Sequence, residues 1–194
     1  MYRKDKKEEY YTEKARKEHY PARSVYKLQE IDKKYKIFKN KDNVLDLGAC
    51  PGSWLLYISE KIGSKGTVIG TDIEEININK KENIVFYKKS VFEFKEGDFE
   101  KKFDSVVSDM APKTTGVDFV DAGKSFELSQ EAFKIANLFL KPGGNFVCKI
   151  FDSELSHELF KEIEKSFEFS KRFKPKAVIK KSKEFYIVAK GFKK

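Results

Sequence analysis

The chain has 194 residues, of which 40% are hydrophobic, 14% aromatic and 37% charged, with a formal net charge of +9. This size and apolar content favour a single domain over residues 1–194 and exclude an intrinsically disordered chain. No apolar stretch approaches the roughly 18 residues of a membrane span, and the N-terminus has no apolar signal segment. Its two cysteines form neither a CxxC motif nor a cluster with histidines. We therefore expect a cytoplasmic protein with no membrane association, disulfide framework or metal site.

The positive charge is concentrated at the two ends of the chain. Residues 1–27 hold nine basic and five acidic residues, and residues 171–194 hold ten basic residues and one acidic residue. Residues 1–20 are expected to form a basic, mobile extension. If the two ends meet in space, they form one cationic face of the kind that binds nucleic acid. A merely solvated, lysine-rich surface explains the same composition.

Helical and strand-like patterns alternate along the chain. The predicted helices span residues 22–35, 53–62, 122–140 and 154–167, and the predicted strands span 43–48, 67–72, 84–87, 103–109, 145–151, 172–178 and 184–189. Such alternation predicts an α/β fold with a mostly parallel sheet and helices on both faces. The connection 179–183 is too short for a parallel crossover, so the last two strands are predicted to form an antiparallel C-terminal hairpin.

In open α/β sheets, ligands bind beyond the carboxyl ends of the strands, so the residues there are candidates for a site. The loop after the first strand contains Gly48, Pro51 and Gly52. It matches neither the GxGxxG fingerprint nor a phosphate-binding P-loop. A glycine turn that leads into a helix suits an adenosyl ligand with a carboxylate, because helix N-terminal amides favour an anion. A plain Gly/Pro turn is the alternative.

Polar residues also follow the next three predicted strands. Asp72, after the second strand, is placed to accept hydrogen bonds from ribose hydroxyls, and a helix N-cap is its alternative role. Ser90, after the third, binds an adenine amino group more weakly than an acidic residue would. Asp109, after the fourth, leads into a Pro/Thr/Gly loop, and a helix N-cap or a turn-forming aspartate is its alternative role.

Lys149 lies inside the apolar segment 146–151, in a strand that the preceding strands place centrally in the sheet. A buried ammonium group is costly unless it is paired. Apolar neighbours and a second lysine nearby favour the neutral amine, which makes Lys149 a candidate base. The alternative is an edge position from which the side chain reaches water.

The chain resembles a known family in several motifs taken together. They are Arg23–Leu28 (RSVYKL), Asp46–Trp54 (DLGACPGSW), Ser108–Pro112 (SDMAP), Lys141–Gly144 (KPGG), Val147–Lys149 (VCK) and Lys183–Ala189 (KEFYIVA). In these, from about Ala22 to Gly191, it resembles the FtsJ/RrmJ (RlmE-type) ribose 2′-O-methyltransferases, which use S-adenosyl-L-methionine. The resemblance implies a Rossmann-like methyltransferase fold with a seven-stranded sheet.

The resemblance also implies site residues. The family's Lys-Asp-Lys-Glu tetrad falls on Lys27, Asp109, Lys149 and Glu184, with Lys149 as the expected general base. The family's cofactor site falls on Gly52, Trp54, Asp72 and Asp109, beside the loop residues Gly48 and Pro51. Ser90 stands where the family usually has an acidic residue, so the resemblance leaves the recognition of adenine open.

The expected acceptor is a uridine of large-subunit (23S-type) ribosomal RNA, as naked RNA or in the assembled subunit, and the protein is expected to be a monomer. The candidate RNA contacts are Arg16, Lys17, Arg23, Arg172, Lys174 and Lys180. The same reaction on transfer RNA and a non-catalytic RNA-binding module for ribosome assembly are the alternatives. A nicotinamide-dependent oxidoreductase is disfavoured, because GxGxxG is missing and a hairpin closes the chain.

Overall fold

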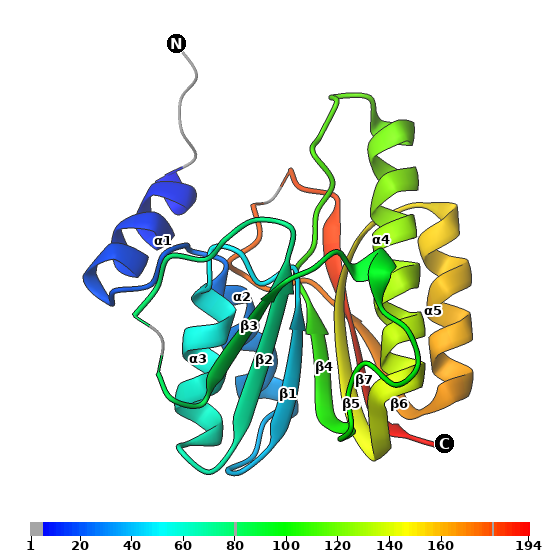
Figure 1. Ribbon diagram of the computed structural model, residues 1–194. Helices are drawn as coiled ribbons and strands as arrows, with labels where there is room; N and C mark the ends of the chain where they lie inside the picture. Colours follow the sequence, from blue (N-terminus) through cyan, green and yellow to red (C-terminus); the bar gives the residue numbers. More distant parts are fainter. Residues whose placement is uncertain (1–5, 80, 180) are drawn as a thin grey trace.

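A computed structural model describes residues 6–79, 81–179 and 181–194 of the chain. Over these residues, seven strands form one sheet in the order β3-β2-β1-β4-β5-β7-β6 (Figure 1). The strands are β1 (Asn43–Leu47), β2 (Thr67–Asp72), β3 (Ile84–Lys88), β4 (Phe103–Ser108), β5 (Leu140–Phe151), β6 (Phe167–Phe173) and β7 (Glu184–Phe192). The pairs among β1 to β5 are parallel, whereas β7 runs antiparallel to both β5 and β6. The predicted architecture is therefore confirmed.

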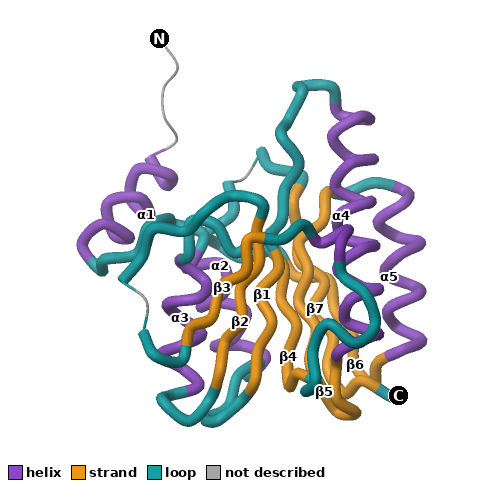
Figure 2. The backbone as a smooth tube through the Cα atoms, in the orientation of Figure 1, coloured by secondary structure: helices purple, strands orange, loops and turns teal. Residues whose placement is uncertain are grey.

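Helices cover both faces of the sheet (Figure 2). One face carries α2 (Val25–Tyr35) and α3 (Ser53–Ile62), and the other carries α4 (Asp118–Phe139) and α5 (Glu154–Ser166). Each face has its own apolar core because successive strand residues point to opposite sides: Val107 packs under α2 and α3, and its neighbour Val106 packs under α4 and α5.

Residues before α2 form a helix, α1 (Lys6–Lys17), which the sequence patterns did not predict. Its Ala15 is buried in the core shared with α2 and α3. Lys7 of α1 donates a hydrogen bond to the backbone oxygen of Val178, in the segment before β7. The two basic ends of the chain therefore meet in space. No helix among the described residues is both long and apolar enough to cross a membrane.

The predicted hairpin is correct in orientation and wrong in position. β6 begins at Phe167, directly after α5, and ends at Phe173, so the connection to β7 spans residues 174–183. Pro175 lacks the N–H that a strand needs, which explains why the predicted strand 172–178 does not form. Instead, Ala177 and Val178 fold back onto the core under α2 and α3.

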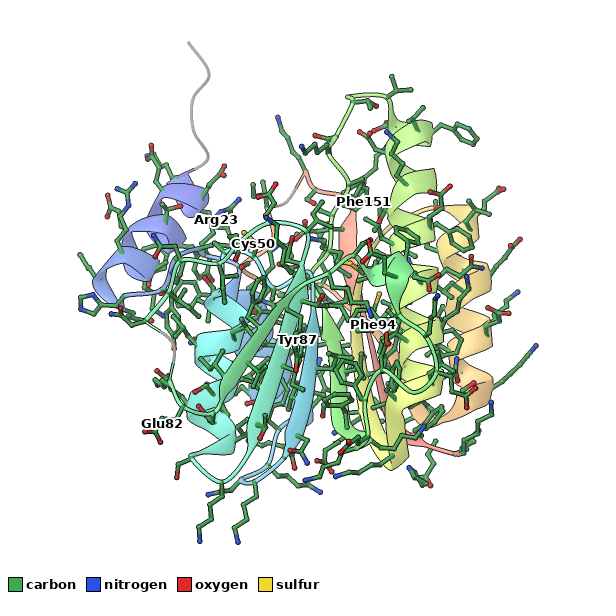
Figure 3. The ribbon with its side chains drawn as sticks, viewed as in Figure 1. Arg23, Cys50, Glu82, Tyr87, Phe94 and Phe151 are labelled. Atoms are coloured by element: carbon green, nitrogen blue, oxygen red, sulfur yellow. The ribbon has the colours of Figure 1, made fainter. Side chains whose placement is uncertain are left out.

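The other boundary differences are small. α4 begins at Asp118, earlier than predicted, and β5 takes in the segment 141–144 that was expected to be a loop. The helix 53–62 and the strand 67–72 have the predicted bounds. The carboxyl edge of β1 to β5 is therefore where the sequence places it, and Arg23, Cys50 and Phe151 lie there (Figure 3).

Candidate active site

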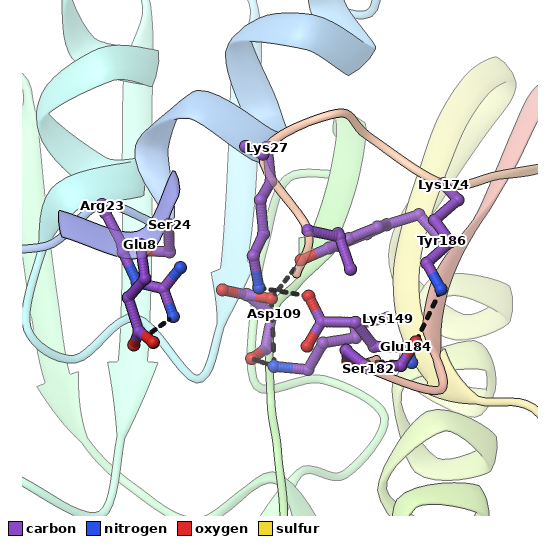
Figure 4. Close-up of polar contacts among 12 residues, drawn as sticks. Glu8, Arg23, Ser24, Lys27, Asp109, Lys149, Lys174, Ser182, Glu184 and Tyr186 are labelled. Carbon is purple, nitrogen blue, oxygen red and sulfur yellow. Dashed lines mark hydrogen bonds and ion pairs between the residues drawn. The ribbon is translucent and has the colours of Figure 1, made fainter. Parts of the chain in front are cut away.

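Four charged side chains from four elements converge at the carboxyl edge (Figure 4). Lys27 comes from the first turn of α2, Asp109 directly follows β4, Lys149 lies in β5, and Glu184 begins β7. Two ion pairs join them: Lys149 Nζ lies 3.0 Å from Asp109 Oδ1, and Lys27 Nζ lies 2.5 Å from Glu184 Oε1. We call these four residues the charged cluster.

Lys149 is buried at the centre of the sheet, because β5 lies between β4 and β7 and only 6% of its side chain is exposed. The alternative of an edge lysine that reaches water is therefore wrong. Its Nζ also donates a hydrogen bond of 2.5 Å to the backbone oxygen of Asp109. Asp109 thus holds the lysine through both its carboxylate and its main chain, which offsets the cost of burying an ammonium group.

The carboxylate of Asp109 is held in its ionised form. Burial alone would raise its pKa, but the ammonium groups of Lys149 and Lys27 and the hydroxyl of Tyr186 lower it below the usual value. A negative charge therefore persists at the centre of the cluster. It is available to orient a cationic or hydrogen-bond-donating group.

Tyr186 is a fifth member of this centre, and the sequence analysis missed it. The residue is fully buried, pairs with Lys149 across β5 and β7, and donates a hydrogen bond of 2.6 Å to Asp109 Oδ1. Burial, then the nearby carboxylates, raises the pKa of its hydroxyl well above the usual value, so it stays a donor. A signal was available: strand residues two apart share a face, which places Tyr186 on the same face as Glu184.

A hollow of about 660 Å³ opens beside the cluster, and we call it the donor hollow. Its wall includes Gly48, Pro51, Asp72, Ser90 and Asp109 of the predicted cofactor site. The structure therefore brings together residues that are far apart in the sequence. Ile73, 64% exposed, and Phe92, 59% exposed, add apolar surface to the same wall.

The polar residues of the donor hollow have local partners. Asp72 Oδ2 accepts a hydrogen bond of 2.9 Å from the backbone N–H of Cys50, and Oδ1 accepts one of 3.0 Å from Glu74. Asp72 thus fixes the glycine loop against the end of β2. Ser90 Oγ accepts a hydrogen bond from the backbone of Phe92 and caps the short helix η1 (Val91–Glu93).

The glycine loop depends on the absence of side chains at two positions. Gly48 has φ of 76°, and a Cβ there would lie 2.3 Å from Met110 Cγ. Gly52 has φ of 105°, and a Cβ there would lie 2.7 Å from Ile78 Cγ2. Trp54, 3% exposed, lies behind this loop and donates a hydrogen bond of 3.1 Å to the backbone oxygen of Ser24, so it joins α3 to the start of α2.

Asp46 in β1 is a second residue that the sequence analysis did not single out. Both of its carboxylate oxygens are buried without a hydrogen-bond partner among the described residues. Burial, then the charges of Asp109 and Asp72, raises its pKa well above the usual value. A buried, unpartnered acid beside a glycine loop is the expected partner for a ligand that carries N–H donors or positive charge.

The candidate RNA contacts lie at both sides of this edge. Arg16 and Lys17 are exposed on α1, and Arg23 is ion-paired with Glu8 at 2.9 Å. Arg172, one residue before the end of β6, forms an ion pair with Asp152, and Lys174 directly follows β6. Lys180 lies outside the described residues.

The sheet order, the glycine loop and the buried charged cluster define the class of Rossmann-like methyltransferases. Solved structures support this class. A ribosomal RNA methyltransferase from Plasmodium falciparum superposes with a TM-score of 0.77 at 26% identity, covering 89% of this chain and 98% of that one. Fibrillarin from Aeropyrum pernix, a complex with S-adenosyl-L-methionine, has a TM-score of 0.62 at 18% identity over 86% of this chain and 76% of that one.

Sequence comparison gives the family. The model of the FtsJ-like methyltransferases matches residues 20–192. The protein called ribosomal RNA large subunit methyltransferase E from Desulfatibacillum aliphaticivorans is 45% identical to this chain, over 93% of this chain and 88% of that one. The one from Bdellovibrio bacteriovorus is 44% identical, over 93% of this chain and 94% of that one. The chain belongs to the FtsJ-like methyltransferase family.

Proposed function

We propose that this protein transfers the methyl group of S-adenosyl-L-methionine to a ribose 2′-hydroxyl of large-subunit ribosomal RNA. The observation that carries the proposal is the buried charged cluster, with a lysine in mid-strand, at the wall of the donor hollow. Relatives that match nearly the whole chain are named for the large ribosomal subunit. The domain proposed to do this is the whole chain, 1–194, with residues 1–20 as its basic extension.

The donor hollow suits the cofactor in volume and in chemistry. At about 660 Å³ it lies in the range of roughly 300–1,000 Å³ that is common for ligand pockets. Asp72 lines the hollow and is proposed to accept hydrogen bonds from the ribose hydroxyls. Asp46 does not line the hollow, but it lies two residues before Gly48, which does, and its partnerless oxygens are proposed to support the ammonium end of the methionine through that loop. The loop under the methionine end would be shaped by Gly48, Pro51, Gly52 and Trp54.

Adenine recognition is proposed to depend on shape and not on a carboxylate. Ser90 keeps its side chain on the backbone of Phe92, so it contributes little to the adenine amino group. Ile73 and Phe92 present exposed apolar surface at the same wall, where a flat ring would be sheltered from water. We therefore propose this apolar surface for adenine binding, where the family usually has an acidic residue.

Lys149 is the proposed general base. S-adenosylmethionine, when bound, supplies an electrophilic methyl group on a positively charged sulfur. Lys149 suits this role by its place, because Asp109 holds its Nζ and itself lines the donor hollow. With the cofactor bound, Lys149 would take the proton of the ribose 2′-hydroxyl as that oxygen receives the methyl group. A positioned base contributes about 10²–10⁴-fold.

The other members of the cluster position these groups. Asp109 orients Lys149 through two contacts and stays negative beside the donor hollow. Glu184 holds Lys27 at 2.5 Å, and Lys27 is thereby aimed at the acceptor ribose from α2. Orientation of this kind reduces the barrier beyond what the base alone contributes.

RNA is proposed to lie across the cationic ends of the chain, which meet where Lys7 contacts Val178. The acceptor must be RNA, because DNA lacks the 2′-hydroxyl. The proposed contacts are Arg16, Lys17, Arg23, Arg172, Lys174 and Lys180. We further propose that the protein acts as a monomer on a uridine of that RNA.

The proposal is tested by methyl transfer from labelled S-adenosylmethionine to separate pools of large ribosomal subunits, ribosomal RNA and transfer RNA. We expect label in the large subunit or its RNA. Label in transfer RNA alone would mean that the proposed reaction is correct and that its substrate is transfer RNA. No label in any pool, with cofactor binding intact, would favour the non-catalytic RNA-binding module.

A further inference from the structure

A second hollow, of about 540 Å³, opens at the carboxyl edge over β5, β7 and β6. We call it the acceptor-side hollow. It shares no lining residue with the donor hollow, but each has one wall in the charged cluster: Asp109 lines the donor hollow and Glu184 lines this one. The cluster therefore stands between two separate hollows.

We propose that the acceptor-side hollow binds the nucleotide next to the methylated one in the RNA chain, with Arg172 holding its phosphodiester. This inference rests on the proposed function and adds where the RNA chain runs. A ribose that receives a methyl group from the Asp109 side must lie at the cluster. Its neighbour in the chain then continues toward Glu184 and into this hollow.

Arg172 is held ready to bind an anion. Its guanidinium carbon lies 4.0 Å from the centroid of the Phe185 ring, which fixes the plane of the group. One nitrogen lies 3.1 Å from His157 Nε2, and another pairs with Asp152 Oδ1. A guanidinium has five N–H donors in a rigid fork, so it binds phosphate oxygens two at a time.

The ion pair of Arg172 is one that a phosphate can replace. The Asp152 side chain is 55% exposed, so its attraction to Arg172 is screened by water. A phosphodiester seated in the hollow would bring its negative charge to the same donors. Asp152 would then turn to solvent without leaving a buried charge unpaired.

Two lysines complete the wall and join the segments that frame it. Lys174 Nζ donates a hydrogen bond of 2.6 Å to the backbone oxygen of Ser182, which closes the 174–183 connection on itself (Figure 4). Lys183 pairs with Asp118, at the start of α4, at 2.6 Å. The lining of the hollow therefore has three cationic residues and two carboxylates, Asp152 and Glu184. The contacts of Lys174 and Lys183 hold the segments around the hollow in place.

The test compares Arg172→Ala with Lys171→Ala. These residues are adjacent on β6 and point to opposite faces, so both variants lose one positive charge but only Arg172 lines the hollow. We expect Arg172→Ala to raise the Kd and the KM for large-subunit RNA about tenfold, with kcat and cofactor affinity within twofold of wild type. Lys171→Ala should change each value less than twofold, and Arg172→Lys should recover only part of the loss.

Equal effects of the two alanine variants on RNA binding would overturn the proposal in favour of general surface charge, and so would an unchanged Kd in Arg172→Ala. The proposed function is tested separately: it fails if the wild type transfers no methyl group. In that case the comparison of Kd values still shows whether the acceptor-side hollow binds RNA. A second measurement replaces each phosphate beside the acceptor nucleotide, one at a time, with an uncharged methylphosphonate. One of the two replacements should abolish the difference between wild type and Arg172→Ala.

Discussion

At the scale of single residues, the site depends on hydrogen bonds to one carboxylate. Asp109 Oδ1 accepts a hydrogen bond of 2.6 Å from the Tyr186 hydroxyl and lies 3.0 Å from Lys149 Nζ in an ion pair. Lys149 thus has a fixed place between its two Asp109 contacts. Tyr186 acts through Asp109, so we treat it as a positioning residue.

Tyr186→Phe should lower kcat for methyl transfer about tenfold and leave cofactor affinity within twofold, because the ring stays and only the bond to Asp109 is lost. The loss of this hydrogen bond should cost about 1 kcal/mol of stability. Tyr57→Phe is the matched control, since its hydroxyl also bonds a carboxylate, Asp32 Oδ2, at 2.8 Å but away from the site. Equal kcat values for the two variants in single-turnover assays would refute a positioning role.

Asp46→Asn should make the cofactor-free protein more stable toward high pH and weaken cofactor binding. The folded-state pKa of Asp46 is raised, whereas the unfolded value is about 3.9, so the contribution of Asp46 to stability falls as pH rises above about 4. The asparagine has no proton to lose. Thermal unfolding from about pH 4 to pH 8, without cofactor, should show a difference that grows with pH, and parallel curves would contradict this account.

The places of the cluster residues could be predicted because Asp109 and Glu184 stand at strand ends and Lys149 interrupts an apolar strand. Tyr186 and Asp46 were not singled out. Each looks like an ordinary strand residue until the pairing of β7 with β5, or the absence of partners in the core, is known. Those features belong to the tertiary structure.

At the scale of elements, the turn between β1 and α3 sets the floor of the donor hollow. Gly52 occupies the N-cap of α3 with φ of 105°, close against Ile78. Residues of the loop after β2 therefore pack on the glycine loop. That contact lies next to Pro51, which lines the hollow.

Gly52→Ala should weaken cofactor binding at least tenfold and lower the melting temperature. Gly97→Ala is a matched control, because Gly97 has φ of 95° but no atom within 4 Å of the place that a Cβ would take. Both variants should lose about 1–2 kcal/mol of stability to a left-handed backbone, and only Gly52→Ala should lose affinity. Calorimetric titration with S-adenosylmethionine measures this, and similar affinities for both would show that the contact with Ile78 is unimportant.

Most elements could be predicted because each strand before α4 is a short apolar run between clear turn signals. The C-terminal hairpin was misplaced because Phe167–Phe173 alternates weakly and follows α5 without a loop. α1 was not predicted because its helix is largely exposed and polar, with only Ala15 buried. In both cases tertiary packing, and not local pattern, decides the element.

At the scale of the whole molecule, the charge distribution is expected to govern RNA affinity. The basic ends meet beside the carboxyl edge, where both hollows open. A phosphate chain that follows this edge would release counterions at each lysine or arginine that it meets. Affinity should therefore depend strongly on salt, whereas cofactor affinity should not.

The slope of log affinity for ribosomal RNA against log salt concentration should be about −0.7 for each contacted phosphate. Binding titrations at several salt concentrations give the slope. Replacing Arg16 and Lys17 together by alanine should make it shallower by about 1.4 if both contact phosphates. A slope near zero in wild type would rule out the cationic face as the RNA-binding surface.

The most direct measurement is the identity of the methylated nucleoside. Large-subunit RNA treated with wild type and with Lys149→Ala would be digested to nucleosides and analysed by mass spectrometry, with cofactor binding checked in both proteins. We predict a 2′-O-methylated nucleoside with wild type and at least a roughly 100-fold lower yield with the variant, which should still bind S-adenosylmethionine. A methyl group on a base, or near-normal yield from Lys149→Ala, would contradict the proposed reaction.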